Sequence, residues 1–221
     1  MFVCGQYQAD KHPLKKFYFK DAPLFLIDAI QRLVQDKICA VRGGVAYVII
    51  CNDNTYMLKD IDLLAYSSNV EKIKLALSSA DEVYLNKNTF GNPVLTAFWK
   101  VEAEYYKIDV LLVSNLPKLQ IRLFRGCCFK VVCASYLWAN RISKITEKKK
   151  RNHSDEKTIN HYKVAKNLSI HLLKEGSVVK KYLMEVKQKR MYIESVLEPL
   201  LDKEELVYFL KLIDSVMELY K

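Results

Sequence analysis

The sequence predicts an α+β fold, with a mixed sheet and flanking helices in residues 1–133 and an all-helical region in residues 134–221. Three observations support this class. Short apolar runs bounded by glycine, proline and asparagine recur in the first region, as expected of strands and turns. After Ala134 long helical periods dominate, and Gly176 is the sole glycine. Between residues 141 and 190, Lys and Arg outnumber Asp and Glu by 15 to 5, so the second region is basic.

The first elements alternate between helix and strand. Apolar residues recur at helical spacing through 24–34, which predicts an amphipathic helix. Residues 38–41 (ICAV) read as a short buried strand that ends at Gly43 and Gly44. We assign the run 45–50 (VAYVII) to a helical turn packed on the sheet, although its β-branched residues also suit a strand.

Strands dominate the middle of the chain. Residues 56–66 (YMLKDIDLLAY) read as one strand, and its alternation places Asp60 and Asp62 on the same face. A helix is predicted at 69–80. Further strands are predicted at 94–103 and 106–113, with one or two more around Arg125-Gly126. Helices are then predicted at 134–148, 156–174, 178–197 and 203–220, the last with a capping box formed by Asp202 and Glu205.

Composition narrows the class of protein. The chain has 221 residues and 51% hydrophobic content, enough for one sizeable core with a smaller helical lobe. No apolar run approaches the ~20 residues that span a bilayer, and the N-terminus lacks the pattern of a secretory signal. The six cysteines form no CxxC pair. Those at 39, 51 and 133 lie in apolar runs, so we expect small buried thiols in a reducing, cytoplasmic protein without a membrane partner.

The charge is uneven along the chain. The formal net charge is +10, and the window 141–190 alone accounts for all of it. Such an excess suits a polyanionic partner, such as nucleic acid or nucleotide phosphates, but also suits a solubilising helical face. For His153, His161 and His171 we favour a solvated helix face. For Trp138 and Tyr162 we favour packing between helices over stacking on a base.

Three acidic residues carry the candidate chemistry. Asp60 and Asp62 follow Gly43 and Gly44 as acid-apolar-acid on one strand face, and Asp109 lies within the apolar strand 106–113. Carboxylates at i and i+2 can bridge a pair of magnesium ions, and a third acid from a neighbouring strand can complete one of them. An acid in an apolar strand is costly to bury unless something pairs with it. For Asp109 that partner is a metal, or a lysine such as Lys107 or Lys59.

The segments VRGGVAYVI and KDIDLLAY, with Asp109 in YKIDVLLV, resemble the nucleotidyltransferase fold of polymerase-β-like enzymes. Within that superfamily the two segments resemble the Gly-Gly and Asp-x-Asp motifs of the AbiEii-type toxin and minimal nucleotidyltransferase group. The resemblance covers about residues 24–140. It implies that Gly43 and Gly44 contact the triphosphate, that Asp60 and Asp62 bind two Mg²⁺ ions, and that Asp109 binds the catalytic ion.

The resemblance also suggests further contacts. Nucleotide binding is assigned to Lys59, beside the acids, and to Lys144, which matches a lysine on the first C-terminal helix of the toxin group. Lys59 stands where these families often carry Ser or Thr, and the segment TINHYKVAKNL lacks their later acids. A nucleic-acid backbone is assigned to the basic run Lys148, Lys149, Lys150 and Arg151.

The expected activity is transfer of a nucleoside monophosphate from a triphosphate such as ATP to an acceptor. The basic helices favour RNA, and the family resemblance suggests a tRNA 3′ end, a toxin or defence role and an antitoxin partner. Two alternatives stay open. One is a nucleic-acid-binding protein of the same fold without turnover, whose binding would not depend on magnesium. The other is an enzyme that nucleotidylates a protein hydroxyl or a small molecule.

Overall fold

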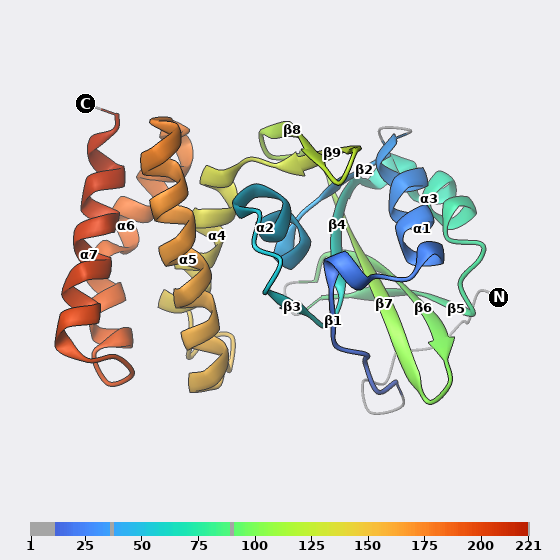
Figure 1. Cartoon of the computed structure of the whole chain (residues 1–221), viewed down its shortest axis with the longest axis horizontal. Helices are drawn as coiled ribbons and strands as arrows, with labels where there is room; N and C mark the ends of the chain where they lie inside the picture. The colour runs from blue at the N-terminus through green and yellow to red at the C-terminus, as the bar shows by residue number, and fades with distance from the viewer. Residues whose placement is uncertain (1–11, 36–37, 89–90, 221) are drawn as a thin grey trace. The chain divides into compact units, whose positions relative to one another are not determined.

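A computed structural model describes residues 12–35, 38–88 and 91–220. The chain divides into two compact units, Met1–Val132 and Cys133–Lys221. The first contains a mixed sheet with helices and the second is helical, which confirms the predicted α+β class (Figure 1).

Within its described residues, the first unit is built around a seven-stranded mixed sheet in the order β5-β6-β7-β4-β2-β9-β8. The β4–β7 and β2–β9 pairs are parallel and the other pairs are antiparallel. A separate two-stranded sheet pairs β1 with β3. The strands are β1 (Phe17–Tyr18), β2 (Cys39–Val41), β3 (Met57–Leu58), β4 (Ile61–Tyr66), β5 (Glu82–Lys87), β6 (Pro93–Val101), β7 (Glu104–Val113), β8 (Leu119–Phe124) and β9 (Cys127–Val132).

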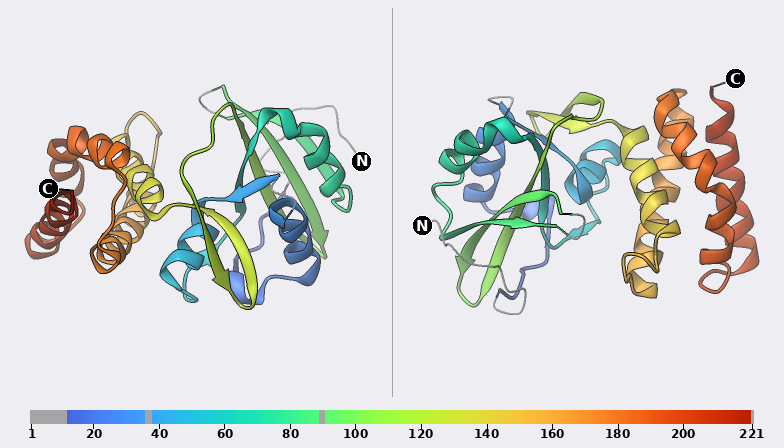
Figure 2. Two further views of the ribbon diagram at one scale, coloured as in Figure 1. Left: turned by 90° about the horizontal axis from the view of Figure 1, so that it is seen from above. Right: turned by 180° about the vertical axis from the view of Figure 1, so that it is seen from behind.

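Helices α1 (Leu24–Gln35), α2 (Gly43–Cys51) and α3 (Val70–Ala76) accompany this sheet, with 3₁₀ turns η2 (Phe19–Asp21) and η3 (Ser67–Asn69) (Figure 2). Helix α1 packs against β2, β9 and α3, and α2 packs against β4 and β8. The run 45–50 is therefore helical, as predicted. All six of its side chains are buried, so neighbouring elements supply the packing that outweighs the β propensity of its Val and Ile residues.

The sequence reading of the sheet needs two corrections. The single strand predicted at 56–66 is interrupted between Leu58 and Ile61, because β3 pairs with β1 whereas β4 joins the main sheet. Asp60 lies in that interruption, so strand alternation does not place it beside Asp62. Strand β5 was not predicted at all. Among the described strands it lies at the edge of the sheet and pairs with β6 alone. Its sequence EVYLNK has just three consecutive apolar residues, too short a run to show a clear strand period.

The remaining predictions of this region are close to the structure. The two long strands form the β6–β7 hairpin, and the segment around Arg125-Gly126 resolves into two strands, β8 and β9. The helix predicted at 69–80 is shorter, since α3 ends at Ala76.

The second unit consists of four helices within its described residues, as predicted: α4 (Ala134–Thr146), α5 (Asp155–Glu175), α6 (Lys180–Leu197) and α7 (Lys203–Glu218). Side chains cap two of them, since Ser154 accepts from the Lys157 amide and Asp202 accepts from the Glu205 amide at 2.8 Å. The Glu205 carboxylate binds Lys166 and Tyr162. The predicted capping box is therefore made only in its Asp202 half.

The core of the second unit lies between these helices. Helix α4 packs on α5 and α6, and α7 packs on α5 and α6. Trp138 and Tyr162 are buried there, as predicted. Trp138 donates from Nε1 to the Ser169 hydroxyl at 2.9 Å, so its one polar atom is satisfied within the core.

Two composition-based expectations can be compared with the structure. Cys39 and Cys133 are buried and Cys51 is half-buried. In the described part of the chain, no helix combines the length and apolarity needed to cross a bilayer. Cys4 and the start of the N-terminal segment, read as lacking a secretory signal, lie outside the described residues.

Candidate active site

Adjacent parallel strands bring two of the predicted acids together. Strands β4 and β7 pair in a register that sets Asp62 directly opposite Asp109. Their neighbours Ile61, Leu63 and Ile108 are fully buried, whereas both aspartates stay partly exposed. Strand alternation thus sends the apolar side chains to the core and leaves both carboxylates on the other face.

Asp60 joins these acids through a lysine. The Lys107 ammonium lies 2.8 Å from Oδ2 of Asp109 and 3.1 Å from Oδ2 of Asp60. The Lys107 side chain is only 12% exposed, so its charge is largely removed from water. Lys107, one of the partners that the sequence suggested for Asp109, therefore pairs with it.

A hydroxyl that sequence reasoning missed holds the other oxygen of Asp109. Thr96 on β6 lies opposite Asp109 across the β6–β7 pair and donates from Oγ1 to Oδ1 at 2.8 Å. Thr96 is buried, so this hydrogen bond fixes the carboxylate against a rigid strand. The available signal was a threonine within an apolar strand that neighbours the acid-bearing strand along the chain.

The electrostatics of the site favour an additional cation. Burial raises the pKa of Asp60, the negative charges of Asp62 and Asp109 raise it further, and Lys107 only partly offsets them. Burial by itself would lower the pKa of Lys107, but the attraction of Asp109 and Asp60 outweighs burial and raises it. The ionised form of Asp60 therefore stays unfavourable even beside Lys107, so a further positive charge would stabilise it.

The two glycines lie at the start of α2, and contacts with neighbouring side chains account for both. Gly43 has φ +66°, and a Cβ there would fall 2.0 Å from Oδ2 of Asp62. A Cβ on Gly44 would fall 2.6 Å from the Leu58 side chain. Gly43 thus lets the backbone approach a predicted metal ligand closely, which a side chain would prevent.

The donor set fits a hard divalent cation. Carboxylate oxygens are the ligands that Mg²⁺ prefers, and the Lys107 contacts show that Asp60 and Asp109 can share a cation. In the described ranges, however, no three His, Cys, Asp or Glu side chains are arranged to hold a metal ion. A cation between Asp60 and Asp109 would compete with the Lys107 ammonium, which contacts both carboxylates.

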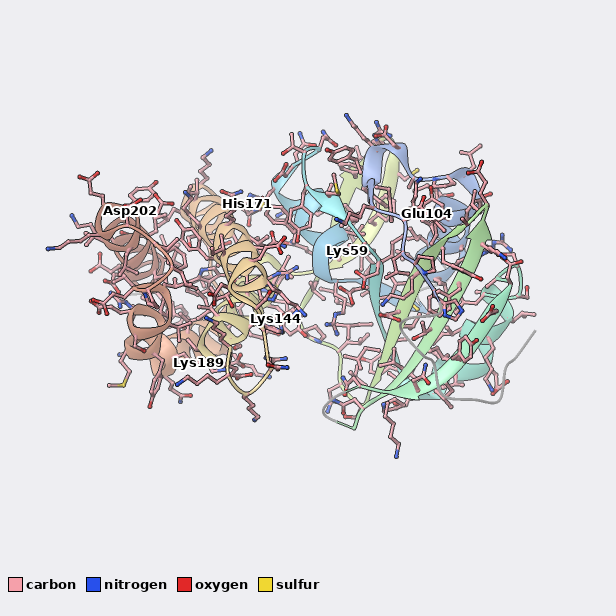
Figure 3. The ribbon with its side chains drawn as sticks, turned by 90° about the horizontal axis from the view of Figure 1, so that it is seen from below. Lys59, Glu104, Lys144, His171, Lys189 and Asp202 are labelled. Atoms are coloured by element: carbon pink, nitrogen blue, oxygen red, sulfur yellow. The ribbon has the colours of Figure 1, made fainter. Side chains whose placement is uncertain are left out.

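The predicted nucleotide-binding lysines belong to different units. Lys59 is exposed between β3 and β4 in the first unit, and Lys144 is half-buried on α4 in the second (Figure 3). Lys59 directly precedes Asp60 in the chain. The triphosphate contacts assigned to both lysines stay predictions.

The basic run after α4 is partly paired with acids. Lys148 binds Asp155, and Arg151 binds Glu147 with an Nη2–Oε2 distance of 2.7 Å. Lys149 and Lys150 are exposed. Two of the four residues assigned to nucleic acid thus already have acidic partners.

The histidines differ from the predicted solvated face. His161 is buried on α5, where its ring contacts Arg141. The centroids of the His161 and His153 rings are 5.1 Å apart. His171 is half-buried beside Glu175. The sequence reading failed for His161 because α4 covers this face of α5, which a single-helix pattern does not reveal.

Comparison with solved structures identifies the fold. A nucleotidyltransferase-like antigenic protein from Paracoccidioides brasiliensis aligns with a TM-score of 0.58 and 12% identity, over 89% of this chain and 95% of that one. ANT(2″)-Ia, solved in complex with adenylyl-2″-tobramycin, aligns with a TM-score of 0.52 and 10% identity, over 75% of this chain and 95% of that one. No family model matches the sequence, and no curated protein matches it closely enough to count as a relative. The chain therefore has a nucleotidyltransferase-like fold, and Asp60, Asp62 and Asp109 lie at one site within it.

Proposed function

We propose that the chain is a magnesium-dependent nucleotidyltransferase, which moves a nucleoside monophosphate from a triphosphate to an acceptor hydroxyl and releases pyrophosphate. One observation carries this proposal: Asp62 and Asp109 face each other on paired parallel strands, with Asp60 tied to Asp109 through Lys107. The nucleotidyltransferase-like fold supports it.

In this proposal Asp60 and Asp62 hold both magnesium ions and Asp109 holds the ion nearer the acceptor. Bound magnesium would neutralise charge on the attacking and leaving oxygens. Thr96 keeps Asp109 oriented through its 2.8 Å hydrogen bond. Lys107 holds Asp60 and Asp109 together before the metal binds, because its ammonium contacts both carboxylates.

The start of α2 is the proposed triphosphate cradle. No side chain caps this end of the helix, so its first N–H groups can donate to phosphate oxygens. Gly43 brings this backbone against Asp62, which would place the phosphates beside the metal ligands. The roles of Gly44, Lys59 and Lys144 in this contact remain part of the proposal.

The proposed acceptor is RNA, with the tRNA 3′ end as the specific candidate. Exposed lysines of the second unit support this choice, among them Lys149, Lys150, Lys157 and Lys163. Such residues would hold the phosphate backbone and make binding fall steeply with salt. A toxin or defence role with an antitoxin partner, as in the AbiEii-type group, belongs to the same proposal.

A small-molecule hydroxyl is the second candidate acceptor. Its support is the complex of ANT(2″)-Ia with adenylyl-2″-tobramycin, in which a protein of similar fold holds a nucleotidylated aminoglycoside. The two candidates share the carboxylate site and differ only in the acceptor.

The test is a transfer assay with purified full-length chain, magnesium and each α-labelled nucleoside triphosphate in turn. Total tRNA and tobramycin are offered separately as acceptors. We expect label on tRNA. Asp62→Ala should lower the rate by about 100-fold or more, because losing only an outer-shell partner of a metal ligand already costs about 10–100-fold. The matched control is Asp28→Ala, which removes an exposed aspartate of α1.

The other outcomes identify the alternatives. Label on tobramycin or on a protein would move the acceptor assignment while keeping the reaction. No label in any reaction, with magnesium-independent tRNA binding unchanged in Asp62→Ala, would overturn the enzyme proposal in favour of a non-catalytic RNA-binding protein.

A further inference from the structure

A second group of buried polar side chains lies between α4 and α5, within the second unit. Arg141 and His161 are each only 5% exposed, and Nη1 of Arg141 lies 3.1 Å from Nδ1 of His161. The centroids of the His153 and His161 rings are 5.1 Å apart. We call Arg141, His153 and His161, with Lys144 and Lys157 beside them, the cationic cluster.

The hydrogen-bond chemistry of this cluster leaves donors in excess. A guanidinium can only donate, so Nδ1 of His161 must accept from Arg141. A neutral imidazole that accepts at Nδ1 carries its proton on Nε2. Nε2 of His161 and Nε of Arg141 are both buried without a partner in the structure. Two buried N–H donors on touching side chains thus lack an acceptor.

The local charge is positive as well. Burial lowers the pKa of His161 to about 2, and the positive charges of Arg141, Lys144 and Lys157 act in the same direction. The pKa of His153 is lowered by burial and then by Lys157, Lys144 and Arg151. Both imidazoles are therefore neutral near pH 7, while Arg141 keeps its charge.

Carboxylates on the same elements are engaged elsewhere. Glu147 binds Arg151 and Lys189, and Asp155 binds Lys148. Glu156 is exposed on the first turn of α5. Among the residues that the structure describes, Arg141 forms no ion pair with an acid. An unpaired buried charge is unfavourable, so a ligand that supplies the missing acceptors would stabilise this pair.

We propose that the cationic cluster is a phosphate-binding site centred on Arg141 and His161. An ionised phosphate offers several acceptor oxygens and negative charge together, which matches two N–H donors and a guanidinium. Lys157 is exposed, and Lys144 and His153 are half-buried, so the cluster extends from the buried pair to solvent. The phosphate can come from a free nucleotide or from an RNA backbone, since both present the same group.

This site goes beyond the proposed nucleotidyl transfer. It shares only Lys144 with the proposed triphosphate contact, uses none of the three aspartates and requires no magnesium, so it can be tested without turnover. Asp62→Ala must retain it. Failure of the phosphate site and failure of the transfer reaction are therefore separate results.

The test is calorimetric titration of the full-length chain with inorganic phosphate and with pyrophosphate, in magnesium-free buffer containing EDTA. Arg141→Met should weaken binding about tenfold or more, because hydrogen bonds to charged groups contribute that much. Arg190→Met is the matched control, since Arg190 lies on α6 and is already paired with Asp214 at 2.8 Å. The control should bind phosphate like the wild type.

A second readout does not depend on a buried substitution. Imidazole ¹⁵N resonances of the wild-type chain should show a shift at His161 Nε2 when phosphate is added. Lys157→Gln, at an exposed position, should raise the phosphate concentration needed for that shift. Equal phosphate affinity in Arg141→Met, or an unchanged His161 resonance at saturating phosphate, would overturn the proposal and leave water as the partner of these donors.

The source of the phosphate follows from competition. ATP and a short oligoribonucleotide are titrated separately against the pyrophosphate complex. Displacement by ATP at the lower concentration identifies a nucleotide site, and displacement by the oligoribonucleotide identifies an RNA-backbone site. Displacement by neither, despite binding of pyrophosphate, would contradict a role for the cluster toward nucleotide phosphates.

Discussion

The two units treat buried charge in opposite ways. In the first unit, the charges of Asp60 and Asp109 are partly balanced by Lys107, which contacts both carboxylates. In the second unit, Arg141 is buried against a neutral histidine, without a carboxylate partner in the described residues. The first site carries its own counter-ion. The second depends on a ligand for the counter-charge, so it is the more sensitive of the two to solution anions.

The two sites also differ in how completely their polar atoms are hydrogen-bonded. Both oxygens of Asp109 are used, one by Thr96 and the other by Lys107. In the cationic cluster, Nε of Arg141 and Nε2 of His161 have no partner. The carboxylate site is thus held in shape before any ligand arrives, whereas the cluster is completed by one.

The largest expected effect comes from removing the internal counter-ion. Lys107→Met should lower the free energy of unfolding by about 2–3 kcal/mol at pH 7.5 in EDTA, somewhat less than for a fully buried pair because both carboxylates keep some solvent contact. Adding magnesium should raise the free energy of unfolding of Lys107→Met more than that of the wild type, because the ammonium no longer competes with the metal. Urea unfolding with and without magnesium measures both effects. The exposed Lys72→Met serves as control, and an equal loss there would contradict the role of Lys107.

The next effect separates a steric clash from backbone strain. Gly43→Ala and Gly126→Ala both place a side chain at positive φ, +66° and +76°, which costs about 1–2 kcal/mol each. Only at Gly43 does the new Cβ meet Asp62, since nothing lies within 4 Å of it at Gly126. We therefore expect Gly43→Ala to cost at least about 1 kcal/mol more than Gly126→Ala and to weaken magnesium binding. Equal losses in urea unfolding would show that the approach to Asp62 is unimportant.

The pH dependence of stability should have opposite signs at the two sites. His161 titrates near 6.5 when unfolded and at about 2 when folded, so its neutral form stabilises the fold above 6.5. That contribution is lost as the pH falls, by about 2 kcal/mol between pH 7.5 and 5. Asp60 has a raised pKa in the fold, so lowering the pH toward 4 relieves its unfavourable charge and adds stability.

The measurement is chemical unfolding of wild type and His161→Gln at several pH values in phosphate-free buffer. Glutamine retains an acceptor for Arg141 but does not titrate. The wild type should lose more stability on acidification than this variant, and parallel curves would show that His161 is not held neutral.

The smallest expected effect contrasts two arginines of the second unit. Without phosphate, Arg141→Met should leave the free energy of unfolding unchanged or raise it by up to about 1 kcal/mol, because it removes an uncompensated buried charge. Arg190→Met should lower it by up to about 1 kcal/mol, because it breaks a two-point ion pair with the half-exposed Asp214. Urea unfolding in phosphate-free buffer compares them. A larger loss for Arg141→Met would mean that its charge is compensated within the protein.

Much of the fold follows from local pattern. The sequence was enough to predict the helix at 24–35, the two strands of the β6–β7 hairpin and the four C-terminal helices. Each of these elements is long enough to show a regular spacing of apolar residues. Strand β5 and the interruption before Ile61 were not predictable, since the apolar run of β5 is short and the interruption arises when β3 pairs with β1.

The candidate site also has features that the sequence predicts and features that it does not. The three aspartates, the glycine pair and the basic helices could be identified from the sequence, because they depend on residue type and on spacing along the chain. Three contacts became known from the folded chain: Lys107 bridges Asp60 and Asp109, Thr96 donates to Asp109, and His161 is buried against Arg141. Those contacts join residues from separate strands and helices, so they exist only once sheet register and helix packing are set.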